Sequence, residues 1–124
     1  MTSRPHVRIG RVYDERTEAD GLRVLVDRMW PRGLTKAAAD LDDWCRTVAP
    51  STALRRWYAH DPERYGEFAR RYRLEVEEPD RAEALARLRE QAERRTVTLL
   101  TATKRPEISE AAVLVEILEG QTGR

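Results

Sequence analysis

Residues 26–33 hold an unusual density of side chains that could bind a ligand, since they read Val-Asp-Arg-Met-Trp-Pro-Arg-Gly. Arg28 and Arg32 could bind an anion through paired N–H donors, as guanidinium groups do with carboxylates and phosphates. Trp30 could stack on a flat group, and Gly33 would let the backbone approach a ligand closely. We therefore take these four residues as candidate ligand-binding residues.

The same segment follows directly on residues 22–26, where four aliphatic residues surround one arginine. Such a run is typical of a strand that is buried on both faces, and the loops after these strands are where open α/β sheets bind ligands. Asp27 stands first in the loop and is a candidate catalytic carboxylate. In the alternative interpretation, Asp27 pairs with an arginine and Trp30 fills the edge of the core.

Two further positions could contribute polar groups. Residues 101–104 read Thr-Ala-Thr-Lys at the end of a second buried strand and just before a helix, so Lys104 and free backbone N–H groups could bind an anion there. The glycines of a phosphate-binding loop are absent, and a simple capping turn explains the segment equally well. His60 precedes Asp61-Pro62 at a helix start and is a candidate acid or base, or else a surface histidine.

The composition bounds the other possibilities. The chain has 124 residues, 23 Lys and Arg against 22 Asp and Glu, and a single cysteine, Cys45. Nearly balanced charge makes nucleic acid an improbable partner, and one cysteine excludes an intrachain disulfide. No spacing of His, Cys or carboxylates indicates a metal site, and no cofactor is indicated. The absence of a signal segment and of an apolar run near 20 residues argues against a membrane and favours the cytoplasm; the oligomeric state stays open.

The pattern of elements predicts a single α/β domain over residues 1–124, with residues 1–5 and 121–124 frayed. We expect a mostly parallel sheet of about four strands, flanked by about five helices, with residues 22–28 and 96–102 as the central strands. The other strands are expected over residues 7–12 and, by preference over helix, 41–48. Helices should begin at caps, which are Thr35, Ser51, Asp61 and Asp80 (the last with Glu83), and a final helix should run through residues 108–118 before Gly120.

These residues also carry a resemblance to a known family. The motif in residues 26–33, together with residues 11–14, 20–21, 43–44, 49–51, 54–55, 60–62 and 98–104, is similar to the YeaO-like family of bacterial proteins, over nearly the whole chain. The resemblance implies a domain of unknown function. It carries over, as motif residues, Asp27, Arg28, Trp30, Arg32, Gly33, His60, Asp61 and Lys104. Where the family often opens its last helix with Asn-His-Ala, this chain has Ser109-Glu110-Ala111, which puts in doubt any mechanism that uses that histidine.

Two functions follow from this pattern. In the first, the protein binds or acts on a small anionic ligand, possibly one that bears phosphate, in a cleft at the strand ends where Arg28, Arg32 and Lys104 share one hollow. In the second, it is a non-catalytic interaction or structural module whose Arg/Trp motif stabilises the fold. The second requires Asp27 in an ion pair, Trp30 buried and a flat surface.

Overall fold

The computed structural model describes residues 6–120 and is built on one four-stranded sheet, so the expected fraying of residues 1–5 and 121–124 lies outside the described residues. All neighbouring strands are parallel, and their order across the sheet is β1-β4-β2-β3. The strands are β1 (Val7–Arg11), β2 (Leu22–Leu25), β3 (Asp43–Trp44) and β4 (Val97–Thr101). The expected α/β class is thereby confirmed, and β2 and β4 are the central strands.

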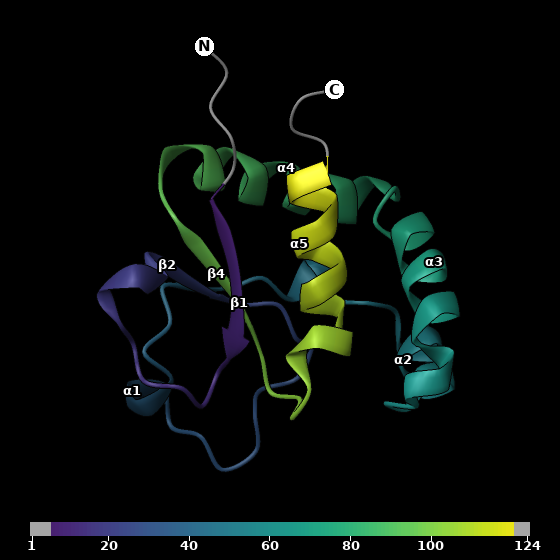
Figure 1. The fold of residues 1–124 in the computed structure, drawn as a ribbon, viewed down its shortest axis with the longest axis horizontal. Coiled ribbons are helices and arrows are strands. Elements are labelled where there is room, and N and C mark those ends of the chain that lie inside the picture. Colours follow the sequence, from purple (N-terminus) through teal and green to yellow (C-terminus); the bar gives the residue numbers. More distant parts are fainter. Residues whose placement is uncertain (1–5, 121–124) are drawn as a thin grey trace.

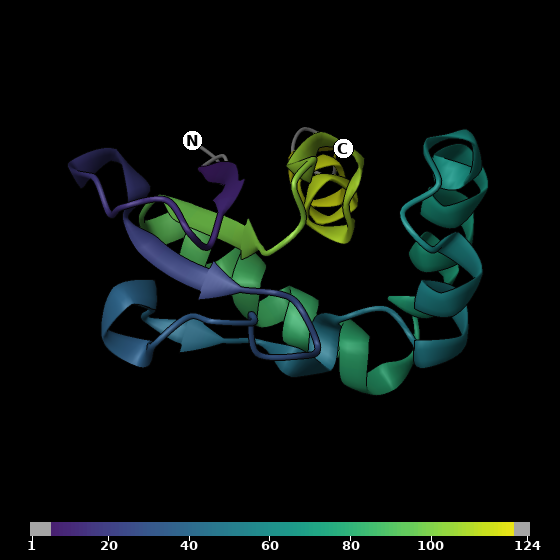
Figure 2. The ribbon, with the colours of Figure 1, turned by 90° about the horizontal axis from the view of Figure 1, so that it is seen from below.

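Five helices accompany the sheet in the part of the chain that the structure describes. They are α1 (Lys36–Ala39), α2 (Thr52–Tyr58), α3 (Tyr65–Glu75), α4 (Pro79–Arg94) and α5 (Glu110–Gly120). Figure 1 shows α5 beside β1 with α3 beyond it, and in Figure 2 the sheet separates α3 and α5 from α1. The longer helices thus cover one face, while α1 and the loops around it cover the other.

The central strands are mostly apolar because both of their faces are covered. Successive side chains of a strand point to opposite faces. Accordingly, Val24 and Leu99 belong to the main core under the longer helices, whereas Leu25 and Leu100 belong to a smaller cluster on the other face. The strands end earlier than the predicted ranges, at Leu25 and Thr101, so that the residues of both candidate segments leave the sheet at its carboxyl edge.

Three of the predicted helix starts are confirmed by their hydrogen bonds. The hydroxyl of Thr35 accepts from the N–H of Ala38 at 3.0 Å and that of Ser51 from the N–H of Leu54 at 3.1 Å. Asp61 caps a short 3₁₀ turn, Pro62–Arg64, that leads directly into α3. Each cap satisfies a backbone N–H that has no partner within its helix.

Three predicted details are wrong. Asp80 is not a cap, because Pro79 takes the first helical position and Glu78 becomes the N-cap residue of α4. Of residues 41–48 only β3 pairs with β2, and the chain then turns through the 3₁₀ segment Arg46–Val48. The final helix begins at Glu110, after a separate 3₁₀ turn that starts at Pro106, and it includes Gly120.

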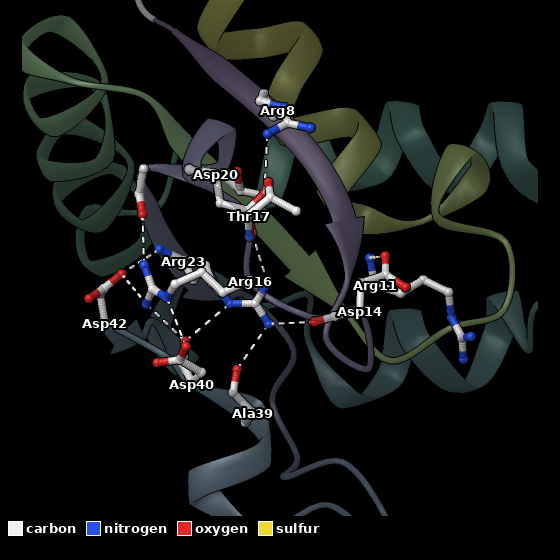
Figure 3. A network of polar contacts seen from close by, with 12 residues as sticks. Arg8, Arg11, Asp14, Arg16, Thr17, Asp20, Arg23, Ala39, Asp40 and Asp42 are labelled. Carbon is white, nitrogen blue, oxygen red and sulfur yellow. Dashed lines mark hydrogen bonds and ion pairs between the residues drawn. The ribbon is translucent and has the colours of Figure 1, made fainter.

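The arginine within β2 has a structural role that the sequence pattern did not reveal. Arg23 is only 1% exposed, and each of the three nitrogen atoms of its guanidinium donates a hydrogen bond (Figure 3). It forms an ion pair with Asp20 at 3.0 Å and donates to the carbonyl oxygens of Asp14, Ala39 and Asp40 at 2.9–3.1 Å. Burial alone would raise the pKa of Asp20, but the N–H of Thr17 and the guanidinium of Arg23 hold that pKa below its ordinary value. Arg23 therefore fastens two loops to the central strand.

Candidate functional site

The candidate site lies at the carboxyl edge of the sheet, beyond the ends of β2 and β4. After β2 the chain continues toward the β3 edge of the sheet. After β4 it continues into α5, which packs on β1 and β4 at the other edge. A crevice between two such diverging connections is the usual ligand site of an open parallel sheet. The order of the strands therefore brings the loops after β2 and β4 together, although their hydrogen-bonded residues are 74–75 positions apart along the chain.

Asp27 joins these two loops directly. Its carboxylate accepts one hydrogen bond from the hydroxyl of Thr101, at 2.7 Å, and another from the N–H of Ala102, at 2.8 Å. The structural-module interpretation required an ion pair between Asp27 and an arginine. In the described part of the chain Asp27 forms no such pair. The hydroxyl of Thr101, at the end of β4, and the N–H of Ala102, the next residue, therefore fix the orientation of the Asp27 carboxylate.

A pocket of about 420 Å³ opens beside Asp27. Five of the candidate residues from the sequence line it, namely Asp27, Arg28, Trp30, Arg32 and His60. They come from the loop after β2 and from the turn between α2 and α3, so the fold brings together side chains from distant parts of the chain. The volume lies in the range of about 300–1,000 Å³ that is usual for small-molecule sites.

Two further arginines, which the sequence analysis did not select, line the same pocket. Arg55 and Arg56 come from α2, one turn after its cap. None of the four arginines of the pocket forms an ion pair with any residue between 6 and 120, whereas Arg16 and Arg23, outside the pocket, are paired. The Nε of Arg55 is buried without a hydrogen-bond partner there. The pocket thus concentrates positive charge in a protein that is nearly neutral overall.

The acid in the last helix also lines this pocket. Glu110, the first residue of α5, is hydrogen-bonded to Asp27 through its side chain. Burial and the adjacent carboxylate of Asp27 hold the pKa of Glu110 well above its ordinary value, although its own N–H and that of Ala111 act in the opposite direction. Two carboxyl groups in contact cannot both ionise readily, so the contact with Asp27 favours the protonated form of Glu110.

Trp30 serves the fold as well as the pocket. Its indole N–H donates to the carbonyl oxygen of Leu34 at 2.6 Å, and its ring meets Trp44 edge-on at 5.3 Å between centroids. The ring is half-buried against the smaller core cluster. This packing of Trp30 is the part of the structural-module interpretation with which the structure agrees.

His60 lies in a constrained turn. Ala59 and His60 both have positive φ angles, 47° and 58°, in the left-handed region that side chains other than glycine rarely adopt. The preceding Tyr58 donates from its hydroxyl to the carbonyl oxygen of Ile108 at 2.6 Å, and burial raises its pKa to about 12. The turn is therefore held against the segment that precedes α5, and His60 is placed at the pocket.

Lys104 and Gly33 do not line the arginine pocket. Lys104 lines a second, adjoining pocket of about 360 Å³. His60 and Thr103 line both pockets. Gly33 has a φ of 73° in open space, so it provides a turn conformation. The expected single hollow is thus divided, and the arginines and the lysine occupy adjacent parts of the same edge.

Residues 6–120 contain neither a metal-binding cluster nor a membrane-spanning helix. No three His, Cys, Asp or Glu side chains are grouped so that they could hold a metal ion. None of the helices in this part of the chain has the length and apolar character needed to cross a membrane.

Comparisons with known proteins identify the family. A family model described as the inactive DUF488-N3 subclade matches residues 6–124. An uncharacterized protein of Mycobacterium tuberculosis is 46% identical over 121 residues, which is 98% of this chain and all of that protein. The uncharacterized protein YeaO of Escherichia coli is 34% identical over 113 residues, covering 91% of this chain and 96% of YeaO. No solved structure was found to match. The chain therefore belongs to the YeaO-like proteins of the DUF488 family, in the branch described as the inactive DUF488-N3 subclade.

Proposed function

We propose that this protein binds a small anionic ligand that bears phosphate, in the pocket at the carboxyl edge of the sheet. The observation that carries the proposal is a set of four arginines that line one pocket and form no ion pair within residues 6–120, namely Arg28, Arg32, Arg55 and Arg56. Guanidinium groups are weakly hydrated and offer forked donors, which suits them to phosphate and carboxylate. An anion would supply negative charge to these four guanidinium groups, none of which is paired with a carboxylate within residues 6–120.

The family description favours binding over turnover. The subclade to which the chain belongs is described as inactive. We accordingly assign Asp27 and His60, first considered as catalytic groups, to shaping and lining the binding pocket. Lys104, in the adjoining pocket, would add a more distant positive charge that attracts the ligand to this edge.

Isothermal titration calorimetry with n-butyl phosphate at low ionic strength tests the proposal. We expect binding that weakens as salt is added and that is lost or reduced at least tenfold in Arg28→Ala and Arg55→Ala, since each removes a charged contact worth about 1.5–3 kcal/mol. Arg94→Ala is the matched control, because Arg94 is an exposed arginine of α4 that lines neither pocket. Absence of binding, or equal losses in all three variants, would contradict the proposal.

The second candidate, a module whose motif stabilises the fold, draws support from the hydrogen bonds of Asp27 and Trp30. It predicts that Arg32→Ala lowers the melting temperature strongly. Our proposal predicts that Arg32→Ala changes the melting temperature little, since the side chain is exposed and has no ion pair in the described structure, while it weakens phosphate binding. Thermal melting with and without n-butyl phosphate separates the two.

A further inference from the structure

The carboxyl pair of Asp27 and Glu110 lies in the same pocket as the four arginines, and its role is not explained by anion binding. An anion would be repelled by a carboxylate, so a pocket made only for phosphate would not contain one. The fold nonetheless holds Asp27 firmly, with one donor from Thr101 and one from Ala102. A carboxylate offers about four acceptor sites. After these two hydrogen bonds and the contact with Glu110, Asp27 can therefore still accept a hydrogen bond from a ligand.

The chemistry of the pair suggests what it recognises. Two carboxyl groups that are hydrogen-bonded to each other still have free acceptor oxygens, and a hydroxyl group of a ligand can donate to one of them. An ammonium group would also suit a carboxylate, but the four guanidinium groups that line the pocket would repel it. A neutral hydroxyl is free of this repulsion.

The size and the lining of the pocket agree with a ligand of two parts. A volume of about 420 Å³ exceeds what a bare phosphate needs and suits a small organic molecule. Arg28, Arg32 and Arg56 are exposed, whereas Glu110 is more buried. The charged groups that could meet a phosphate are thus the more accessible ones, and the carboxyl pair lies further in.

We propose that the ligand is a phosphomonoester of a hydroxyl-bearing molecule, such as a sugar phosphate, with its phosphate on the arginines and a hydroxyl on the Asp27–Glu110 pair. This inference rests on the proposed function and specifies its ligand class. It adds Glu110 to the site as the group that distinguishes a hydroxylated phosphomonoester from a plain alkyl one.

The test compares two probes that share the phosphomonoester group, n-butyl phosphate and D-ribose 5-phosphate. Titration calorimetry at constant pH and low salt should give a dissociation constant about tenfold lower for ribose 5-phosphate, which corresponds to about one good hydrogen bond. In Glu110→Ala the ratio of the two constants should fall to about one. Glu116→Ala is the matched control on the same helix, since Glu116 is exposed and lines neither pocket.

A second measurement needs no variant and so does not depend on whether Glu110→Ala folds. In NMR spectra that detect side-chain carboxyl carbons, ribose 5-phosphate should shift the signals of Asp27 and Glu110, and n-butyl phosphate should not. Equal affinity for the two probes, or carboxyl signals that do not shift when ribose 5-phosphate is added, would overturn this inference. The proposed anion site would then still stand. Failure of both probes to bind would overturn the anion site and this inference together.

Discussion

Replacing the buried arginine of β2 tests the account of how the fold is held together. Arg23→Met keeps most of the side-chain volume but removes the guanidinium that meets Asp20 and the carbonyl oxygens of Asp14, Ala39 and Asp40. Breaking a buried ion pair costs about 3–5 kcal/mol. We take the lower end, about 3 kcal/mol, because Thr17 still donates to Asp20.

The carbonyl oxygens add to this loss. Leaving a buried acceptor without a donor costs about 1 kcal/mol at the least, and of these three residues only Ala39 is buried. The free energy of unfolding should therefore fall by about 4 kcal/mol, which approaches the whole stability of a small domain. Urea denaturation followed by circular dichroism measures this difference.

Arg8→Met is the matched control for this experiment. Arg8 forms an ion pair with the same carboxylate, that of Asp20, at 3.1 Å, but its side chain is 46% exposed. An exposed pair contributes about 0–1 kcal/mol, so the control should unfold at nearly the parent urea concentration. Similar small losses in Arg23→Met and Arg8→Met would refute the view that Arg23 fastens the loops to the sheet.

Two other substitutions test further parts of the structure. The raised pKa of Glu110 means that the folded chain keeps a proton that the unfolded chain releases above about pH 4.5, so stability is lost as pH rises from there toward the folded pKa. Glu110→Gln should therefore raise the melting temperature at pH 7 and have little effect at pH 4, and a benefit independent of pH would contradict this. Gly21→Ala should destabilise strongly, because Gly21 has a φ of 62° and an added Cβ would lie 2.1 Å from the carbonyl oxygen of Thr96; a melting temperature close to the parent's would be inconsistent with this geometry.

Much of the fold was predictable because its signals are local. An apolar run bounded by polar residues marked each central strand, and Thr35, Ser51 and Asp61 each bond to a backbone N–H within three residues. Boundaries that depend on competition between neighbours were less predictable. Asp80 with Glu83 matched a cap pattern, but the ring of Pro79 already fits the first helical turn.

The site was predictable only where strand ends define it. Parallel strands end at the same edge, which was enough to bring the loop after β2 beside the loop after β4. The local sequence gave no sign that α2 would direct Arg55 and Arg56 to the same pocket, because that depends on how α2 packs. The burial of Arg23 was missed for a similar reason, since its partners lie in loops whose positions are set by the whole fold.

A crystal structure with bound D-ribose 5-phosphate tests the central claim most directly. We expect the phosphate within hydrogen-bond distance of Arg28, Arg32, Arg55 or Arg56, and a hydroxyl of the sugar beside Asp27 and Glu110. Density for the ligand at another surface, with the pocket filled only by water at saturating concentration, would contradict the account.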